Sequence, residues 1–166
     1  MLKSKSWIVR AGTRDPGSSK AQKLLSEEQN DDGRLEIVAA HVYDIETLRK
    51  AFAGAYGVFA ITSERHPDKK IVEEKEMQHE IEAGRNIVLA AKECNVQHFV
   101  FSSLPNMMQA TSGQFPKLYH FDNKHAVEVI AKEELPGKVT CLIPGFFYTN
   151  LQWRQYCRRQ GKSSCT

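Results

Sequence analysis

Apolar and polar positions follow two alternating periods along the chain. Short runs of β-branched and apolar residues predict five strands, at residues 7–11, 36–42, 57–62, 98–103 and 139–143. The runs FVF at 99–101 and CLI at 141–143 are unbroken, which is typical of strands buried on both faces of a parallel sheet.

Four stretches between these strands have helical spacing. The first follows residues 15–17, where Ser18 or Ser19 can cap it, and the second covers 45–53 behind Asp44 as a capping acid. The third covers 72–93 and the fourth covers 122–133, where a Leu-Pro-Gly sequence at 135–137 stops it. Each helix has an apolar face, formed in turn by Ala21, Leu24 and Leu25; by Leu48 and Phe52; by Met77, Ile81, Gly84, Val88 and Ala91; and by Ala126, Val129 and Ile130. On the third helix the opposite, solvent-facing side is expected to hold Glu76, Glu80, Glu82 and Lys92.

Strands that alternate with helices predict an α/β fold, a Rossmann-like doubly wound parallel sheet. The chain has 166 residues, enough for one domain of ordinary size. We expect this domain to cover residues 1–150. Residues 151–166 form a divergent C-terminal tail that carries Arg154, Arg158, Arg159 and Lys162.

Charge and composition exclude several classes of protein. The net charge is only +3, and the basic residues are interleaved with acids, so nucleic acid is not an expected partner. No window approaches 18 uninterrupted apolar residues, and no apolar segment follows the basic N-terminus, so neither a membrane span nor a secretory signal is expected. These patterns predict a cytoplasmic protein, with a nuclear location left open, and no metal site.

Ligands of doubly wound sheets bind at the carboxyl ends of the strands. After the first strand come Thr13 and Arg14, and an arginine at such a position can hold a ribose 2′-phosphate, which favours NADP over NAD. The alternative is a solvated arginine before a turn. After the third strand, Thr62 and Ser63 suit a ribose and nicotinamide groove, although hydroxyl residues serve ordinary turns equally well.

Two further segments are candidates for chemistry. Lys124 opens the fourth helix and can reach toward a ribose hydroxyl or a substrate, but the residue four positions before it is His120, so a tyrosine–lysine pair is absent in register. The alternative is a solvated lysine. After the last strand Gly145 allows a close approach of the backbone, and the aromatic residues that follow can flank a nicotinamide or form a packed turn.

Five segments of the chain, by their sequence and their order, resemble the NmrA-like branch of atypical short-chain dehydrogenases. They are VRAGTRDP at 9–16, GVFAIT at 57–62, VQHFVFSSLPN at 96–106, HFDNK at 120–124 and LIPGFFYTNL at 142–151. The resemblance implies an NADP-dependent oxidoreductase, often of fungal secondary metabolism, acting on a small-molecule carbonyl or enone. The alternative that it implies is a non-catalytic NAD(P)-sensing regulator that binds a transcription factor.

The resemblance also implies roles for individual residues. Arg14 faces the 2′-phosphate, and Thr62 and Ser63 line the nucleotide groove. Lys124 binds the nicotinamide ribose and is the proton donor if there is catalysis. The nicotinamide end is closed by Phe147, Tyr148, Thr149 and Asn150.

Two departures from the family pattern lead to further expectations. The family's first strand and its glycine-rich loop have no counterpart, since residues 1–6 resemble the end of the helix that follows that loop. We therefore expect a truncated chain. In the family's strand order 3-2-1-4-5-6, the loss of strand 1 leaves the two inner strands beside it without a neighbour. We also expect NADP to bind weakly or not at all, because the glycine-rich loop that holds the pyrophosphate is missing. The downstream substrate-binding part is also expected to be missing, and a truncated gene product is a third interpretation of the whole chain.

Overall fold

A computed structural model describes residues 6–27, 33–145 and 147–152 of the chain. Five strands, five α-helices and two 3₁₀-helices occupy these residues. In chain order they are β1 (Val9–Thr13), α1 (Ser19–Glu27), β2 (Leu35–Ala39), α2 (Ile45–Phe52), β3 (Gly57–Ala60), η2 (Glu74–Gln78), α3 (His79–Glu93), β4 (His98–Ser102), α4 (Met107–Ala110), α5 (Tyr119–Glu134), β5 (Val139–Leu142) and η3 (Tyr148–Gln152).

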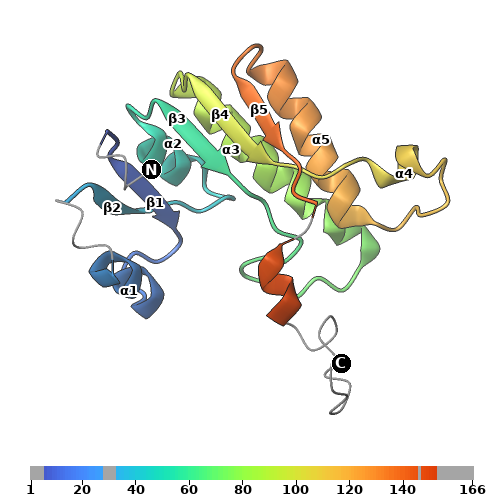
Figure 1. The fold of residues 1–166 in the computed structure, drawn as a ribbon, viewed down its shortest axis with the longest axis horizontal. Coiled ribbons are helices and arrows are strands. Elements are labelled where there is room, and N and C mark those ends of the chain that lie inside the picture. Colours follow the sequence, from blue (N-terminus) through green and yellow to red (C-terminus); the bar gives the residue numbers. More distant parts are fainter. Residues whose placement is uncertain (1–5, 28–32, 146, 153–166) are drawn as a thin grey trace, which may run out of the picture.

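The strands form two parallel sheets, as Figure 1 shows. β1 pairs with β2, and a second sheet has the order β3-β4-β5. All the paired strands run parallel with helices between them, which confirms the predicted α/β class. Within the described residues no ladder joins β1 to β3. This break lies where the sequence predicted two strands without a neighbour.

The hydrophobic core lies between the three-stranded sheet and the layer formed by α2, α3 and α5 (Figure 1). Phe99 and Phe101 of β4 point into it and are at most 1% exposed, packed among small and β-branched residues such as Val88 of α3 and Val127 of α5. Strand side chains alternate between two faces, and on the opposite face of this sheet Phe59 remains 59% exposed.

Most predicted elements exist, but several of their bounds differ. β1 begins two residues later than expected and includes Thr13, so that Arg14 is the first residue beyond the strand. The predicted helix 72–93 is a 3₁₀-helix that begins two residues later, at Glu74, followed by α3 from His79, and Glu73 and Glu76 form a capping box at its start. α5 begins at Tyr119 rather than at residue 122. The Asp44 cap of α2 is confirmed, since its carboxylate accepts hydrogen bonds from the amides of residues 46 and 47.

Two predictions about helix faces were wrong. Glu80, expected on the solvent side of α3, is fully buried. On α5 the apolar residue Val129 is 40% exposed, while the polar side chains of Asn123, Lys124 and Glu128 are buried. Polar contacts with α3, η2 and the loop after β3 stabilise these residues on the inward side of α5, and an apolar-only pattern cannot reveal such contacts.

Side chains hold the two sheets together in place of a ladder. The guanidinium of Arg10 on β1 donates to the carbonyl oxygens of Ala53 (2.6 Å) and Ala51 (3.3 Å) at the end of α2. Just before each inner strand, the rings of Trp7 and Tyr56 lie 5.6 Å apart. These contacts cross the place where backbone hydrogen bonds are missing.

Some expectations lie partly outside the described residues. Of the expected tail, only residues 151 and 152 are described, and they end η3. None of the described helices is long and apolar enough to cross a bilayer. The described part of the chain also contains no group of three or more metal-binding side chains.

Candidate functional site

A cleft of about 360 Å³ lies beyond the carboxyl ends of β3, β4 and β5. We call it the carboxyl-edge cleft. The parallel strands bring their last residues to one edge of the sheet, and the start of α5 faces the same edge. Its lining consists of Ile61, Thr62, Ser63, Glu64, Ser102, Leu104, His120, Lys124, Pro144 and Phe147.

Lys124 is anchored at the base of this cleft. Its ammonium donates to the carbonyl oxygen of Thr62 at 2.7 Å and to the hydroxyl of the same residue at 3.0 Å. It also lies 3.3 Å from a carboxylate oxygen of Glu80, and the whole lysine is only 4% exposed. Burial lowers the pKa of Lys124, while the negative charge of Glu80 and the hydrogen bond to it oppose that change.

Glu80 connects the buried side chains of the cleft. It is fully buried on α3, accepts a hydrogen bond from the Thr62 hydroxyl at 2.7 Å, and lies 3.1 Å from Nδ1 of His120. Burial acts to raise the pKa of Glu80, but the hydrogen bonds from His120 and Thr62 and the charge of Lys124 outweigh burial and hold it below its usual value. The carboxylate is therefore held charged behind the wall of the cleft, where it contacts the lining residues Thr62, Lys124 and His120.

A group of aromatic and imidazole rings holds the loop that forms one wall of the cleft. The Tyr43 hydroxyl lies 2.6 Å from Nδ1 of His79, and the other nitrogen of that imidazole lies 2.9 Å from the carbonyl oxygen of Glu64. The Tyr43 ring also stacks on His66 with centroids 4.6 Å apart. Burial, together with the nearby carboxylates, raises the pKa of Tyr43 to about 12, so the phenol stays protonated and keeps its hydrogen bonds.

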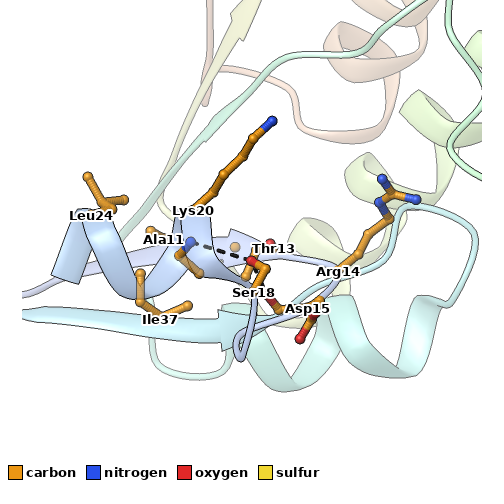
Figure 2. A pocket seen from close by; sticks show the side chains of 10 residues that line it. Ala11, Thr13, Arg14, Asp15, Ser18, Lys20, Leu24 and Ile37 are labelled. Carbon is orange, nitrogen blue, oxygen red and sulfur yellow. Dashed lines mark hydrogen bonds between the residues drawn. The ribbon is translucent and has the colours of Figure 1, made fainter.

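A second cavity, of about 610 Å³, lies at the carboxyl end of β1 between that strand and α1. We call it the β1 cavity. Figure 2 shows its side chains, with Thr13 and Arg14 from the end of β1 and Lys20 from the first turn of α1. One nitrogen of Arg14 donates to the carbonyl oxygen of Pro67 (3.1 Å) and pairs with Asp68 (3.4 Å). The arginine and the aspartate are each 55% exposed, so a bound anion can compete for this guanidinium.

The structure brings the expected site residues together in two groups. Thr62, Ser63, Lys124 and Phe147 line the carboxyl-edge cleft. Thr13 and Arg14 line the β1 cavity. Three other expected residues, Tyr148, Thr149 and Asn150, belong to η3 and do not line either cavity; Tyr148 is 86% exposed. Their proposed role over the nicotinamide stays a prediction.

Glu80 and His120 were not among the site residues that the sequence predicted. A signal for Glu80 existed, because residues 80, 84 and 88 are four apart and share a helix face with the apolar stripe of α3. An acid on such a stripe needs a buried partner. The partners, Lys124 and His120, lie 40 or more residues away and could not be identified from local spacing.

The chain matches the model of the NmrA-like family over residues 1–163. It is 31% identical to the NmrA-like family domain-containing oxidoreductase FrzB of a Cladobotryum species, over 80% of this chain and 37% of that protein. It is also 31% identical to the NmrA-like family domain-containing oxidoreductase hkm9 of Aspergillus hancockii, over 89% of this chain and 41% of that protein. The chain thus spans less than half the length of these relatives.

Solved structures share the fold. A triphenylmethane reductase of a Citrobacter species, complexed with NADP(H), superposes on 91% of this chain and 45% of its own chain, with a TM-score of 0.61 and 21% identity. An NADPH-dependent quinone oxidoreductase of Escherichia coli, complexed with NADPH, covers the same shares with a TM-score of 0.63 and 19% identity. The fold, the order of the motifs and the match over residues 1–163 agree, and the chain belongs to the NmrA-like family.

Proposed function

We propose that this chain forms the NADP(H)-binding part of an oxidoreductase that reduces a carbonyl or enone group of a small molecule. The observation that carries the proposal is the pair of cavities at the carboxyl ends of the parallel strands. One cavity offers exposed cations, and the other contains a buried lysine and carboxylate. Relatives named as oxidoreductases, several of them from fungi, support an oxidoreductase function, and we extend the proposal to fungal secondary metabolism.

The donors of the β1 cavity fit a phosphorylated ribose. Arg14 and Lys20 supply positive charge, and Ser18, directly before α1, lines the same cavity. A 2′-phosphate carries up to two negative charges, and a guanidinium can bind its oxygens with paired hydrogen bonds. This chemistry favours NADP(H) over NAD(H), which has a neutral hydroxyl at that position.

The carboxyl-edge cleft fits the reacting end of the dinucleotide and a small substrate. Thr62, Ser63 and Ser102 contribute polar residues to the lining, and Phe147 supplies an apolar surface on which a flat ring can pack. When bound, the reduced nicotinamide supplies a hydride. The side chains of the cleft orient the substrate carbonyl and provide the proton that reduction also requires.

We expect the affinity of this chain for NADP(H) to be low. Among the described residues, no glycine-rich turn joins a strand to a helix between the two cavities, where the pyrophosphate of a dinucleotide needs backbone N–H groups. The arginine and the hydroxyls therefore bind the two ends of the cofactor without support at its middle.

The test is a titration of the purified chain with NADPH and, separately, with NADH, following thermal unfolding. Binding to the folded state raises the melting temperature with ligand concentration. We expect a rise with millimolar NADPH and a smaller one with NADH. No rise with either nucleotide would overturn the proposal that this chain binds the cofactor.

A second candidate function is the non-catalytic NAD(P)-sensing regulator that binds a transcription factor. The observation that favours it is the burial of Lys124, whose three N–H groups are directed at Thr62 and Glu80 rather than at the cleft. Such a protein would show the same shift in melting temperature but would not consume NADPH with any carbonyl or enone. A turnover assay after the titration separates the two functions.

A further inference from the structure

We infer that His120, rather than Lys124, exchanges a proton with the molecule bound in the carboxyl-edge cleft, and that Glu80 is the positioning residue that orients its imidazole. This inference rests on the proposed oxidoreductase function. It assigns the proton transfer to a side chain that the sequence analysis left without a role.

Lys124 is poorly placed to give up a proton. Two of its N–H groups are bound by Thr62 and the third is directed at Glu80, and the residue is 4% exposed. Deprotonation would leave the fully buried carboxylate of Glu80 without its closest positive charge, which is costly in a medium of low dielectric constant. We assign to Lys124 the charge balance of Glu80 and the orientation of Thr62.

His120 has the opposite arrangement. An ionised carboxylate only accepts hydrogen bonds, so Nδ1 of His120, at 3.1 Å from Glu80, carries the hydrogen. The other ring nitrogen, Nε2, has no hydrogen-bond partner among the residues that the structure describes. The side chain lines the cleft and is 32% exposed. Nε2 is therefore the ring nitrogen that remains available to a bound substrate.

The proton transfer balances without further groups. When bound, NADPH would supply a hydride to the substrate carbonyl carbon. The contribution of this chain is the proton, which passes from Nε2 of the His120 imidazolium to the substrate oxygen as that oxygen gains negative charge. The N–H bond breaks, an O–H bond forms, and the electron pair stays on Nε2. The neutral imidazole keeps its Nδ1–H on Glu80, and the carboxylate remains charged throughout.

The charged groups around His120 come from three elements. Glu80 faces it from α3, Lys124 lies one turn further along α5, and Glu64 lines the same cleft from the loop after β3. Glu80 is the one whose carboxylate lies within hydrogen-bonding distance of the ring among the described residues. It is therefore the group expected to select the tautomer.

The deciding experiment is ¹⁵N NMR of the chain with labelled histidine, with the six imidazoles assigned through single variants such as His120→Gln. We expect neutral His120 to carry its hydrogen on Nδ1. In Glu80→Gln the amide oxygen is expected at the position that faces the donors Thr62 and Lys124, which leaves the amide NH2 facing Nδ1, so the hydrogen should move to Nε2. His125, the next histidine on α5, is the matched control and should keep its tautomer in Glu80→Gln.

An Nε2–H tautomer in the unmodified chain would overturn the inference, whether or not the Glu80 variant folds. So would an unchanged tautomer in folded Glu80→Gln. Chemical modification gives a second measurement on the unmodified chain. Diethyl pyrocarbonate should modify His120, whereas acetic anhydride should modify Lys124 at least ten times more slowly than the exposed Lys20. An unreactive His120 together with a Lys124 that is acetylated as fast as Lys20 would also overturn the inference.

Turnover separates this inference from the proposed function. With cyclohex-2-enone and NADPH, His120→Gln should lower kcat about 100-fold or more with little change in KM, and His125→Gln should change neither. A full rate in His120→Gln would assign the proton to another group. If the unmodified chain neither binds nor consumes NADPH, the proposed function fails, while the tautomer and the modification rates still decide the arrangement of His120 and Glu80.

Discussion

Gly84 on α3 and Val127 on α5 touch where the two helices pack against each other. A Cβ atom placed on Gly84 would lie 2.3 Å from Cγ2 of Val127 and 3.0 Å from its Cβ. Only glycine permits this distance between the helices. The close packing matters for the cleft, because Glu80 lies one turn before Gly84 and Lys124 lies one turn before Val127.

We expect Gly84→Ala to destabilise the fold by about 1–3 kcal/mol, because the helices must move apart to admit the methyl group. Chemical denaturation measures this loss. Gly145→Ala is the matched control, since a Cβ there meets nothing within 4 Å. Val127→Ala in the Gly84→Ala background should recover part of the loss. Equal stabilities of the two alanine variants would contradict the close contact.

Glu80→Gln should destabilise the fold by about 3 kcal/mol near neutral pH, because it leaves Lys124 buried without its counter-charge. The exposed Glu82 of the same helix is the control, and Glu82→Gln should change stability by no more than about 0.5 kcal/mol. Denaturant unfolding of the three proteins under one set of conditions makes the comparison.

The stability that Glu80→Gln loses relative to the unmodified chain should change both toward acid pH and toward alkaline pH. The pKa of Glu80 is below its usual value in the folded state, so its stabilisation is present above the unfolded pKa of about 4.3 and is lost as pH falls through the folded pKa. The difference in unfolding free energy between the unmodified chain and Glu80→Gln should therefore become smaller at acid pH.

In the alkaline range the effect involves Lys124. Without Glu80, burial lowers the lysine pKa unopposed, so the unfolded variant binds more protons than the folded one and the variant gains stability as pH rises. Unfolding free energies measured from acid to alkaline pH test both statements. A difference independent of pH would contradict them.

The sequence predicted the parts of the structure that depend on local pattern. The strands, the Asp44 cap and the apolar residues of α3 follow from periodicity and capping chemistry, and the carboxyl ends of the strands indicated where Thr62 and Arg14 would lie. Most bounds differ from the predicted ones by one to three residues, and the first part of the predicted helix 72–93 is a 3₁₀-helix.

The buried polar network could not be predicted in the same way. Glu80, Thr62 and Lys124 are separated by 18 to 62 residues and meet only after α3 and α5 pack together. Their burial places Glu80 of α3 and Lys124 of α5 inward beside the apolar residues of both helices, because a buried charge with partners can share the inward face. The local sequence therefore predicts where the strands end but not which side chains of α3 and α5 pair with each other.

Arg14→Gln should weaken NADPH binding about tenfold or more and leave NADH binding nearly unchanged. The guanidinium is proposed to contact the 2′-phosphate, and a hydrogen bond to a charged group contributes about 1.5–3 kcal/mol. Arg85→Gln removes an equally positive side chain from the exposed face of α3 and is the control. Titrations by thermal shift or fluorescence measure the affinities of the three proteins for each nucleotide. Equal losses of affinity for NADPH and NADH would mean that Arg14 does not contact the 2′-phosphate and instead maintains the shape of the β1 cavity.

β1 and β2 should exchange their backbone amide hydrogens faster than β4. β4 has a paired strand on each side and its phenylalanines are buried, whereas β1 and β2 form a two-stranded sheet attached to α2 by Arg10. A two-stranded sheet is at best marginally stable alone, and local opening frees its amides without unfolding the core. Hydrogen exchange followed by mass spectrometry should show at least tenfold faster exchange in peptides covering 9–13 and 35–39 than in those covering 98–102. Arg10→Gln should widen this difference, because it removes the hydrogen bonds to the end of α2. Equal protection of all three strands would show that the two sheets open and close as one unit.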